Sequence, residues 1–100
     1  ILFPYIVKYN EEAAFGKYQK IYNYISTEKK CESEFSKGML EQAVRELNAQ
    51  VGIPAKLSDA GVTDEYFVQM TEDAMKSGNI AVNPRKTVRE DILALYKEAL

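Results

Sequence analysis

The sequence contains no histidine, and this absence excludes several kinds of chemistry within the chain. Without histidine, the residues cannot supply a Cys-His pair, a Ser-His-Asp triad or a histidine-based metal site. Cys31 is the single cysteine, so no disulfide can form inside the chain. Such cysteine usage is typical of a reducing compartment. We therefore expect a cytoplasmic protein in which Cys31 is an inert residue and not a nucleophile.

The sequence also lacks a large excess of charge of either sign and any long apolar stretch. The chain has 13 basic and 15 acidic residues, which leave a net charge of −2, whereas a phosphate-binding surface usually needs a basic excess. The apolar stretch Ile1–Val7 is far too short to span a bilayer, and it lacks the flanking segments of a signal peptide. We therefore expect neither nucleic acid nor a membrane as a partner.

Glycines and carboxylates form no recognisable site. The five glycines stand singly, without the glycine-rich spacing of a phosphate-binding loop. The paired acidic residues stand at expected helix starts, where capping and the helix dipole account for them. These pairs are Glu11/Glu12, Glu32/Glu34 and Glu90/Asp91. The residues alone therefore predict no catalytic, cofactor-binding or metal-binding group in the chain.

What the sequence does contain is apolar residues at helical spacing. Its 46% apolar and 28% charged residues fall in the range of globular proteins. Apolar residues that recur every three or four positions predict helices, and no alternating strand pattern appears. We expect a short buried helix over about Phe3–Tyr9, with a buried strand as the alternative. Further helices are expected over about Glu11–Ser26, Glu34–Val51 and about Asp64–Lys76.

Local signals indicate where these helices begin and end. Ser33 or Ser36 offers an N-cap for the helix over Glu34–Val51, and Gly52 is placed to end it. Thr63 is a natural N-cap for the following helix, and Gly78 is expected to end that one. A single helical turn over Leu57–Ala60, closed by Gly61, is also possible in the connection between them.

The C-terminal stretch reads as a turn followed by a terminal helix. Asn79–Val82 leads into Asn83-Pro84, where the residue before proline is pushed out of the α region. Thr87 and Glu90 have the spacing of a capping box. The helix that follows has one apolar face, formed by Val88, Ile92, Leu95, Tyr96 and Ala99. We expect Arg85 to pair with a nearby acid and fix the turn. With this helix, the chain is predicted to be one all-α domain over 1–100, a bundle of five to six helices.

Three stretches carry a family resemblance, and their order and spacing agree across the whole chain. They are Ile1–Asn10, then Gly52-Ile53-Pro54 with Leu57 and Gly61-Val62, and then Asn83-Pro84-Arg85 with Thr87, Glu90-Asp91-Ile92 and Leu95-Tyr96. Together they resemble the C-terminal part of the iron-containing (group III) alcohol dehydrogenases. The first is similar to the family's apolar helix, the second to its linker and the third to its closing helix.

The resemblance implies an enzyme of two domains. An N-terminal α/β domain would bind NAD or NADP, and a helical C-terminal domain of the dehydroquinate-synthase-like fold would contribute to the metal site. In this family one Asp and three His bind iron(II) or zinc, and the last His lies in a His-Gly-x-x-Asn-Ala stretch just before the segment similar to Ile1–Asn10. The implied reaction is hydride transfer between NAD(P) and a small alcohol or aldehyde, with the metal as Lewis acid, in a homo-oligomer.

By this resemblance the chain is a fragment. Ile1 lies in an apolar stretch without a preceding methionine, so we expect that the nucleotide-binding domain and the metal-ligand segment are missing. We then expect this fragment to hold no cofactor and to be structural and inactive alone. The alternative is a free-standing helical protein-interaction module that binds a partner through the apolar surface of Ile1–Tyr9. A third option is a related branch such as glycerol dehydrogenase or dehydroquinate synthase, although Asn83-Pro84-Arg85 favours the alcohol dehydrogenases.

The resemblance suggests one site residue. Asn79–Val82 corresponds to the stretch where family members approach the substrate pocket. Many relatives have a Cys-Thr-Pro-Gly type sequence there, and this chain departs from it. We therefore carry over only Asn79, as a candidate that lines the substrate pocket.

Overall fold

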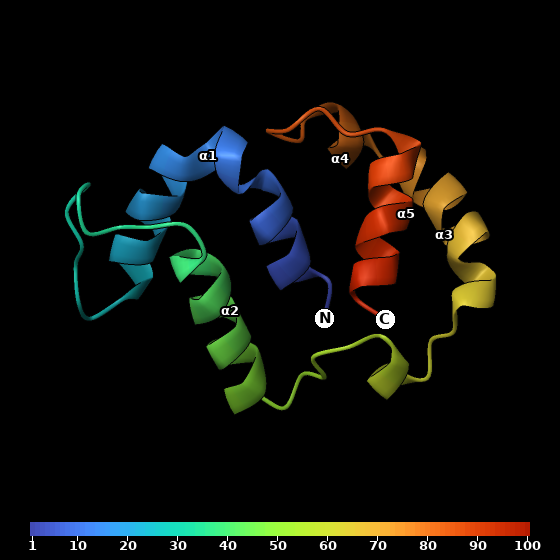
Figure 1. Ribbon diagram of the computed structural model, residues 1–100, viewed down its shortest axis with the longest axis horizontal. Coiled ribbons are helices and arrows are strands. Elements are labelled where there is room, and N and C mark those ends of the chain that lie inside the picture. The colour runs from blue at the N-terminus through green and yellow to red at the C-terminus, as the bar shows by residue number, and fades with distance from the viewer.

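The computed structural model describes residues 1–100 and consists of helices joined by loops (Figure 1). The α-helices are α1 (Phe3–Ile25), α2 (Met39–Gln50), α3 (Phe67–Met75), α4 (Gly78–Ala81) and α5 (Arg89–Glu98). Two 3₁₀ turns, η1 (Ser58–Ala60) and η2 (Asp64–Tyr66), lie between α2 and α3. The absence of strands confirms the predicted all-α class. No helix is both long enough and apolar enough to cross a membrane.

Helix α1 replaces the two helices expected over Phe3–Tyr9 and about Glu11–Ser26. Pro4 lies in its first turn, where the missing N–H needs no partner. The backbone departs from helical geometry only at Ala14 (φ −130°, ψ 16°), where the helix is kinked. The predicted break before Glu11 is wrong because this carboxylate does not lie at a helix start. Its side chain is buried within α1 and reaches the beginning of α2 instead.

Helix α2 starts at Met39, later than the predicted Glu34. Gly38 takes the N-cap position with φ 86°, so neither Ser33 nor Ser36 caps the helix. The Gly38 N–H donates a hydrogen bond of 2.7 Å to Glu11 Oε1, which places an acidic group of α1 at the positive end of α2. The start of α2 therefore depends on a residue from another helix.

Two glycines with positive φ end elements where the sequence predicts. Gly52 follows α2 with φ 77°, and Gly61 closes η1 with φ 79°. In this left-handed region, side chains larger than that of glycine are strained. The sequence therefore indicates both ends correctly.

The helix predicted over about Asp64–Lys76 appears as η2 followed by α3. Thr63 stands at the predicted N-cap position, although its hydroxyl contacts the Glu65 carboxylate and not a backbone N–H. Gly78 was expected to end α3, but α3 ends at Met75. Gly78 instead begins the short helix α4, where no helix was predicted. The hydroxyl of Ser77 accepts a hydrogen bond from the Asn79 N–H and so supports that extra turn.

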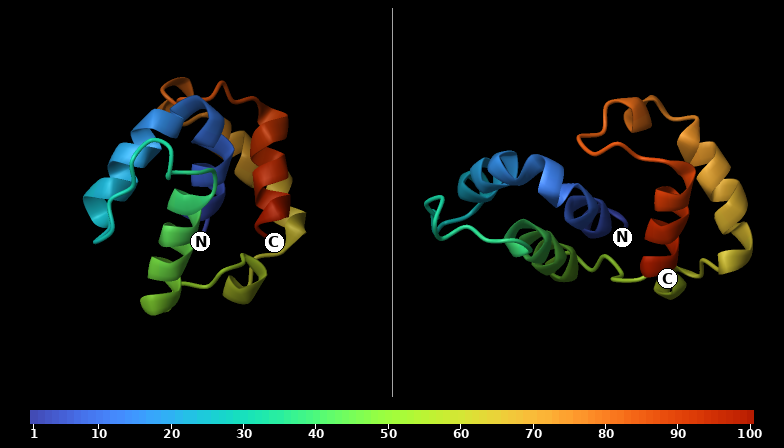
Figure 2. Two further views of the ribbon diagram at one scale, coloured as in Figure 1. Left: turned by 60° about the vertical axis from the view of Figure 1, so that its left-hand side comes forward. Right: turned by 45° about the horizontal axis from the view of Figure 1, so that its top comes forward.

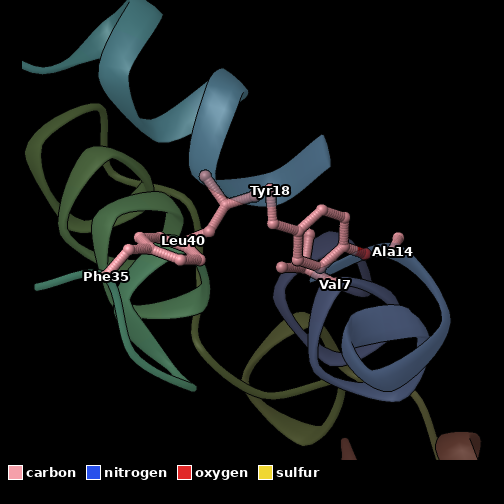
Figure 3. Close-up of a cluster of buried hydrophobic side chains, with 5 residues drawn as sticks. All are labelled: Val7, Ala14, Tyr18, Phe35 and Leu40. Atoms are coloured by element: carbon pink, nitrogen blue, oxygen red, sulfur yellow. The ribbon is translucent and has the colours of Figure 1, made fainter. Parts of the chain in front are cut away.

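The helices form two groups that share the N-terminal half of α1, which lies between α2 and α5 (Figures 1 and 2). In the first group, α1 and α2 enclose a small core with the loop before α2. Its buried members, shown in Figure 3, are Val7, Ala14, Tyr18, Phe35 and Leu40. Phe15 and Tyr22 pack around Phe35, with ring centroids 5.2 and 5.6 Å from it. Phe35 therefore belongs to the core although it precedes α2.

The second core joins α3 and α5 to the beginning of α1 and the connection after α2. Its buried members are Tyr5, Leu57, Phe67 and Ala99. The rings of Phe67 and Tyr96 stack with centroids 5.6 Å apart. Leu57 N–H donates a hydrogen bond of 2.8 Å to the Ala99 carbonyl, which ties the connection to the end of α5. This core fixes α5 beside α1 and thereby forms the walls of the site described next.

Candidate functional site

Two adjoining cavities lie between the first half of α1, the end of α3, α4 and α5. Their volumes are about 320 Å³ and about 150 Å³. Ile6, Ile80, Ile92 and Leu95 line both, so we treat them as one feature, the α1/α5 cleft. The larger cavity is completed by Leu2, Tyr5, Ala74, Ser77 and Tyr96, and the smaller by Tyr9, Asn79, Asn83 and Thr87. The cleft is therefore apolar along most of its length and polar at one end.

Helical periodicity accounts for the apolar wall of the cleft. One face of α1 places Ile6 there together with neighbours three and four positions away. Ile92, Leu95 and Tyr96 do the same from α5, which is most of the apolar face predicted for that helix. Val88, predicted for the same face, is instead exposed at the N-cap.

A pair of asparagines fixes the polar end of the cleft. Asn10 of α1 and Asn83 before α5 exchange two side-chain hydrogen bonds, each 2.8 Å from Nδ2 to Oδ1. Asn83 Nδ2 also lies 2.8 Å from the Arg85 carbonyl and 3.0 Å from Thr87 Oγ1. The Thr87 hydroxyl in turn donates to the Arg85 carbonyl at 2.9 Å. The turn after α4 is thereby held against α1.

The predicted capping box at Thr87 and Glu90 is wrong by one position. The N-cap is Val88, whose N–H donates a hydrogen bond of 2.9 Å to Asp91 Oδ2. This bond is the main reason why the pKa of Asp91 is lowered from its usual value. Thr87 lies one residue before the N-cap, and its hydroxyl bonds within the turn, where it donates to the Arg85 carbonyl and accepts from Asn83 Nδ2.

Arg85 does not pair with an acid, contrary to the prediction. Its Nη1 donates a hydrogen bond of 3.0 Å to the Tyr9 carbonyl, and its guanidinium lies 4.1 Å from the centroid of the Tyr9 ring. The Tyr9 hydroxyl donates to the Lys86 carbonyl at 3.2 Å. Arg85 therefore does fix the turn, but through a backbone carbonyl and an aromatic ring of α1.

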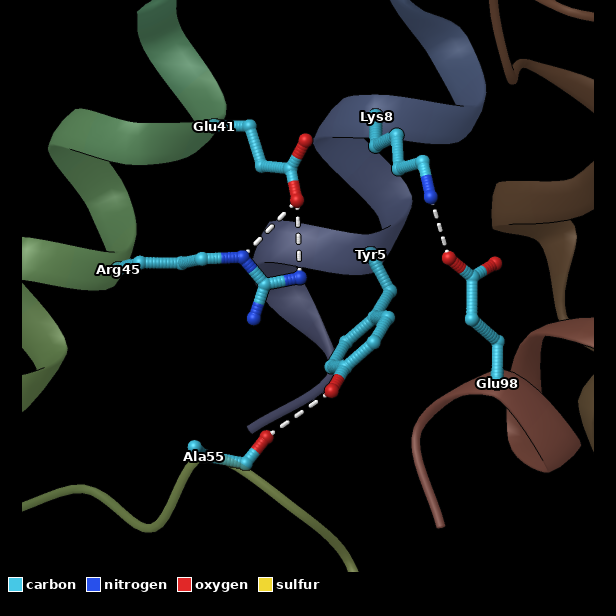
Figure 4. A network of polar contacts seen from close by, with 6 residues as sticks. All are labelled: Tyr5, Lys8, Glu41, Arg45, Ala55 and Glu98. Carbon is cyan, nitrogen blue, oxygen red and sulfur yellow. Dashed lines mark hydrogen bonds and ion pairs between the residues drawn. The ribbon is translucent and has the colours of Figure 1, made fainter. Parts of the chain in front are cut away.

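Around Tyr5, which lines the larger cavity, polar contacts join four separate segments of the chain (Figure 4). The hydroxyl of Tyr5 donates to the Ala55 carbonyl at 3.1 Å. Arg45 of α2 lies 4.6 Å above the Tyr5 ring and forms an ion pair of 2.8 Å with Glu41. Lys8 of α1 pairs with Glu98 of α5 on the opposite side of α1, and this bond raises the pKa of Lys8. These contacts hold α1 between α2 and α5.

Asn79, the candidate pocket residue, lies at the polar end of the smaller cavity beside Asn83 and Thr87. Its side-chain amide forms no hydrogen bond within the chain. Its backbone N–H donates a hydrogen bond to Ser77 Oγ. Sequence reasoning did not identify the Asn10–Asn83 pair that fixes this end. The pre-proline turn pointed to Asn83 and the resemblance to both Asn10 and Asn83, as positions in two separate motifs, but neither indicated that they are in contact.

The side chains present do not fit an iron or zinc site. The chain has no histidine, and no group of three or more Cys, Asp or Glu side chains lies close enough together to hold a metal ion. Cys31 is exposed in the loop before α2, with Sγ 3.0 Å from Ser33 Oγ, and lines neither cavity. The cleft thus offers an apolar wall and amide groups, without a nucleophile paired to a base.

The model of the Fe-containing alcohol dehydrogenase family, C-terminal part, matches residues 1–100. The chain belongs to this family. The match covers the whole sequence and confirms the resemblance that the three separate stretches indicated. The helical fold is thus that of the C-terminal part of a Fe-containing alcohol dehydrogenase.

Relatives within the family support the assignment. The chain is 32% identical over 100 residues to 1,3-propanediol dehydrogenase of Citrobacter freundii and 33% identical over 100 residues to lactaldehyde reductase of Escherichia coli. Each match covers 99% of this chain and 26% of the relative, so the chain spans about a quarter of the length of these proteins. It is also 25% identical to NADPH-dependent butanol dehydrogenase of Clostridium saccharobutylicum, over 97% of this chain and 26% of that protein. No solved structure matches.

Proposed function

We propose that these residues are the helical C-terminal part of an alcohol dehydrogenase that transfers a hydride between NAD(P) and a small alcohol or aldehyde. The observation that carries this proposal is the family match over residues 1–100, together with relatives that act on 1,3-propanediol, lactaldehyde and butanol by name. The printed names share a short-chain alcohol or aldehyde as substrate. This supports a substrate of the same class here.

In this proposal residues 1–100 are part of a longer polypeptide, and the iron and the NAD(P) are bound by its N-terminal part. The relatives are long enough for this, because the matched region is 26% of their length. The side chains described above do not form a metal site, so the contribution of this chain is to shape and wall the site. We further propose a cytoplasmic homo-oligomer, and the single cysteine supports a reducing compartment.

Asn79 has a defined role in the proposal. Its unengaged amide offers two donor hydrogens and an acceptor oxygen at the polar end of the α1/α5 cleft. A substrate hydroxyl or carbonyl could form one hydrogen bond with that amide, while its carbon chain contacts the apolar wall. Asn79 then contributes to substrate binding without taking part in bond making.

Steady-state assays of the complete gene product test the proposal. With iron supplied, we expect reduction of short aldehydes with NAD(P)H and oxidation of short diols and alcohols with NAD(P)⁺. A folded, metal-loaded and nucleotide-binding protein without any such turnover would contradict the dehydrogenase assignment. Turnover by residues 1–100 alone would contradict the assignment of the cofactors to the rest of the polypeptide.

The role of Asn79 is tested separately by Asn79→Ala. Loss of one neutral hydrogen bond to the substrate should raise KM by about twofold to tenfold with kcat nearly unchanged. Gln50→Ala is the matched control, because Gln50 is exposed at the end of α2 and lines neither cavity of the cleft. An unchanged KM for Asn79→Ala would show that Asn79 does not contact the substrate.

A further inference from the structure

A second apolar surface lies between α1 and α2, and it shares Ile6 with the α1/α5 cleft. It is a groove of about 410 Å³ between the two halves of α1 and α2. Nine of its 11 lining residues are apolar, and none is charged. Several of them are large and open to solvent: Phe3 is 60% exposed, Ile25 56% and Leu47 57%. We call this surface the α1/α2 groove.

The groove exists because predicted core faces are only partly covered. Tyr18, Ile21 and Ile25 recur at helical spacing along α1, but only Tyr18 is buried. On α2 the stripe containing Val44 and Leu47 is likewise buried at Val44 and open at Leu47. Each helix therefore carries apolar residues beyond those that the contact between α1 and α2 can cover.

The geometry of the groove suits one additional helix. The kink at Ala14 folds α1 into two arms, and α2 packs against them (Figures 1 and 3). The residues that line the groove come from both arms and from α2, so three helical rods border it. A fourth rod laid along the groove would complete a four-helix arrangement, in which apolar stripes face a common centre. The overall shape agrees with an incomplete bundle, because the molecule measures 43 × 30 × 18 Å and only 14 of its 100 residues are buried.

We propose that the α1/α2 groove is the docking site for an amphipathic helix from the N-terminal part of the same polypeptide. This rests on the proposed function, in which about three quarters of a longer chain lies outside residues 1–100. The relatives have the length for it, since the matched region is 26% of each. In such a chain the segment before Ile1 would approach the groove at Phe3, and tethering gives an internal segment a higher effective concentration than a second copy.

The groove also specifies the chemistry of the helix that fills it. Helix α2 has 12 residues and is therefore about 18 Å long, so the docked segment needs about three turns. Its buried face should carry apolar residues at positions i, i+3 or i+4, and i+7, without a charge, because no charged residue of the groove could pair with one.

Thiol labelling of the complete gene product tests this proposal. In a Cys31→Ser background, Leu47→Cys places one thiol in the groove, and Gln50→Cys places the control thiol on the exposed side of the same helix. We expect Leu47→Cys to react with Ellman's reagent at least about tenfold more slowly than Gln50→Cys. Ile21→Cys with Lys20→Cys as control repeats the measurement on α1, should the first variant not fold.

The rate at which these thiols react does not depend on turnover. The docking proposal can therefore fail while the dehydrogenase assignment stands, and the dehydrogenase assignment can fail while the groove is protected. Equal reaction rates at groove and control positions would overturn it, because the groove would then be open. Protection that is lost when the protein is diluted to a monomer would also overturn it, since a second copy would then cover the groove.

A photoreactive maleimide on Leu47→Cys should cross-link to one segment before Ile1 with the apolar spacing given above. Cross-links to another copy, or to a segment without that spacing, would contradict the proposed occupant.

Discussion

Asn10 and Asn83 are 73 positions apart, and their side-chain amides form a reciprocal pair with two hydrogen bonds of 2.8 Å. Asn10 is only 5% exposed, so water cannot readily replace its partner. The pair joins the middle of α1 to the turn that starts the C-terminal segment. The position of α5, and with it the polar end of the α1/α5 cleft, depends on this contact.

A double-mutant cycle should measure the strength of that pair. Asn10→Ala removes both bonds of the pair and leaves Asn83 Oδ1 in the partly buried turn without its donor, so it should lower the free energy of unfolding by about 1–3 kcal/mol. Asn83→Ala should cost more, because Asn83 also bonds the Arg85 carbonyl and Thr87. The double variant should be more stable than the sum of the single effects predicts, as measured by urea unfolding. Strict additivity would show that the pair contributes no coupling energy.

The replacement of Glu11 tests how α2 begins. Its carboxylate accepts the Gly38 N–H at 2.7 Å and is mostly buried. Glu11→Gln keeps an acceptor but removes the charge that faces the positive end of α2, so we expect a loss of about 1 kcal/mol in unfolding free energy. Glu12→Gln is the matched control, because Glu12 is exposed and its one ion pair, with Lys37, lies on the surface. Equal effects of the two changes would show that the contact with Gly38 has no special weight.

These first predictions also show where sequence reasoning reaches its limit. Periodic apolar residues predicted the helices, and single glycines predicted the ends at Gly52 and Gly61, because both signals are local. The start of α2 could not be predicted, since Gly38 is held by Glu11 from another helix. The capping box was misplaced by one residue because the Thr87 hydroxyl is engaged by the turn, and that turn is held by Asn10.

For the candidate site, the sequence predicted the apolar face of α5 but not what it faces. Periodicity places Ile21 on an apolar stripe of α1 and Leu47 on an apolar stripe of α2. It cannot show which element covers each stripe. Asn79 was placed near a pocket only through the family resemblance. In the structure this residue lies at the end of a cavity, and its contact with substrate stays a prediction.

The hydroxyl of Tyr5 provides a third prediction, for the end of the cleft near the connection after α2. Tyr5→Phe removes the hydrogen bond to the Ala55 carbonyl and keeps the ring below the Arg45 guanidinium. We expect a loss of about 1 kcal/mol in unfolding free energy. Tyr24→Phe is the control, since Tyr24 is 91% exposed, and it should change stability by less than about 0.5 kcal/mol. If both variants unfold at the same urea concentration, the Tyr5 bond does not hold the connection in place.

The last prediction concerns the pH dependence that Asp91 gives to α5. Its pKa is lowered from the usual value of 3.8, chiefly because its carboxylate accepts the Val88 N–H. A carboxyl group whose pKa is lower in the folded state stabilises that state fully above the unfolded value, and the stabilisation is lost as pH falls through the folded value. At pH 6, Asp91→Asn should therefore be less stable than the unsubstituted protein, by about 0.5 kcal/mol.

This difference should begin to shrink once the pH falls below about 3.8, because the carboxyl group of Asp91 is then protonated first in the unfolded state, and it should be lost as the pH falls through the lower folded-state pKa. Urea unfolding of both proteins between pH 6 and pH 3 measures it. Glu90→Gln removes a charge from the same helical turn without removing a bond to Val88, and so separates the hydrogen bond from the general effect of the helix dipole. If the difference between Asp91→Asn and the unsubstituted protein stayed constant across this range, the Asp91 carboxylate would not act as the cap of α5.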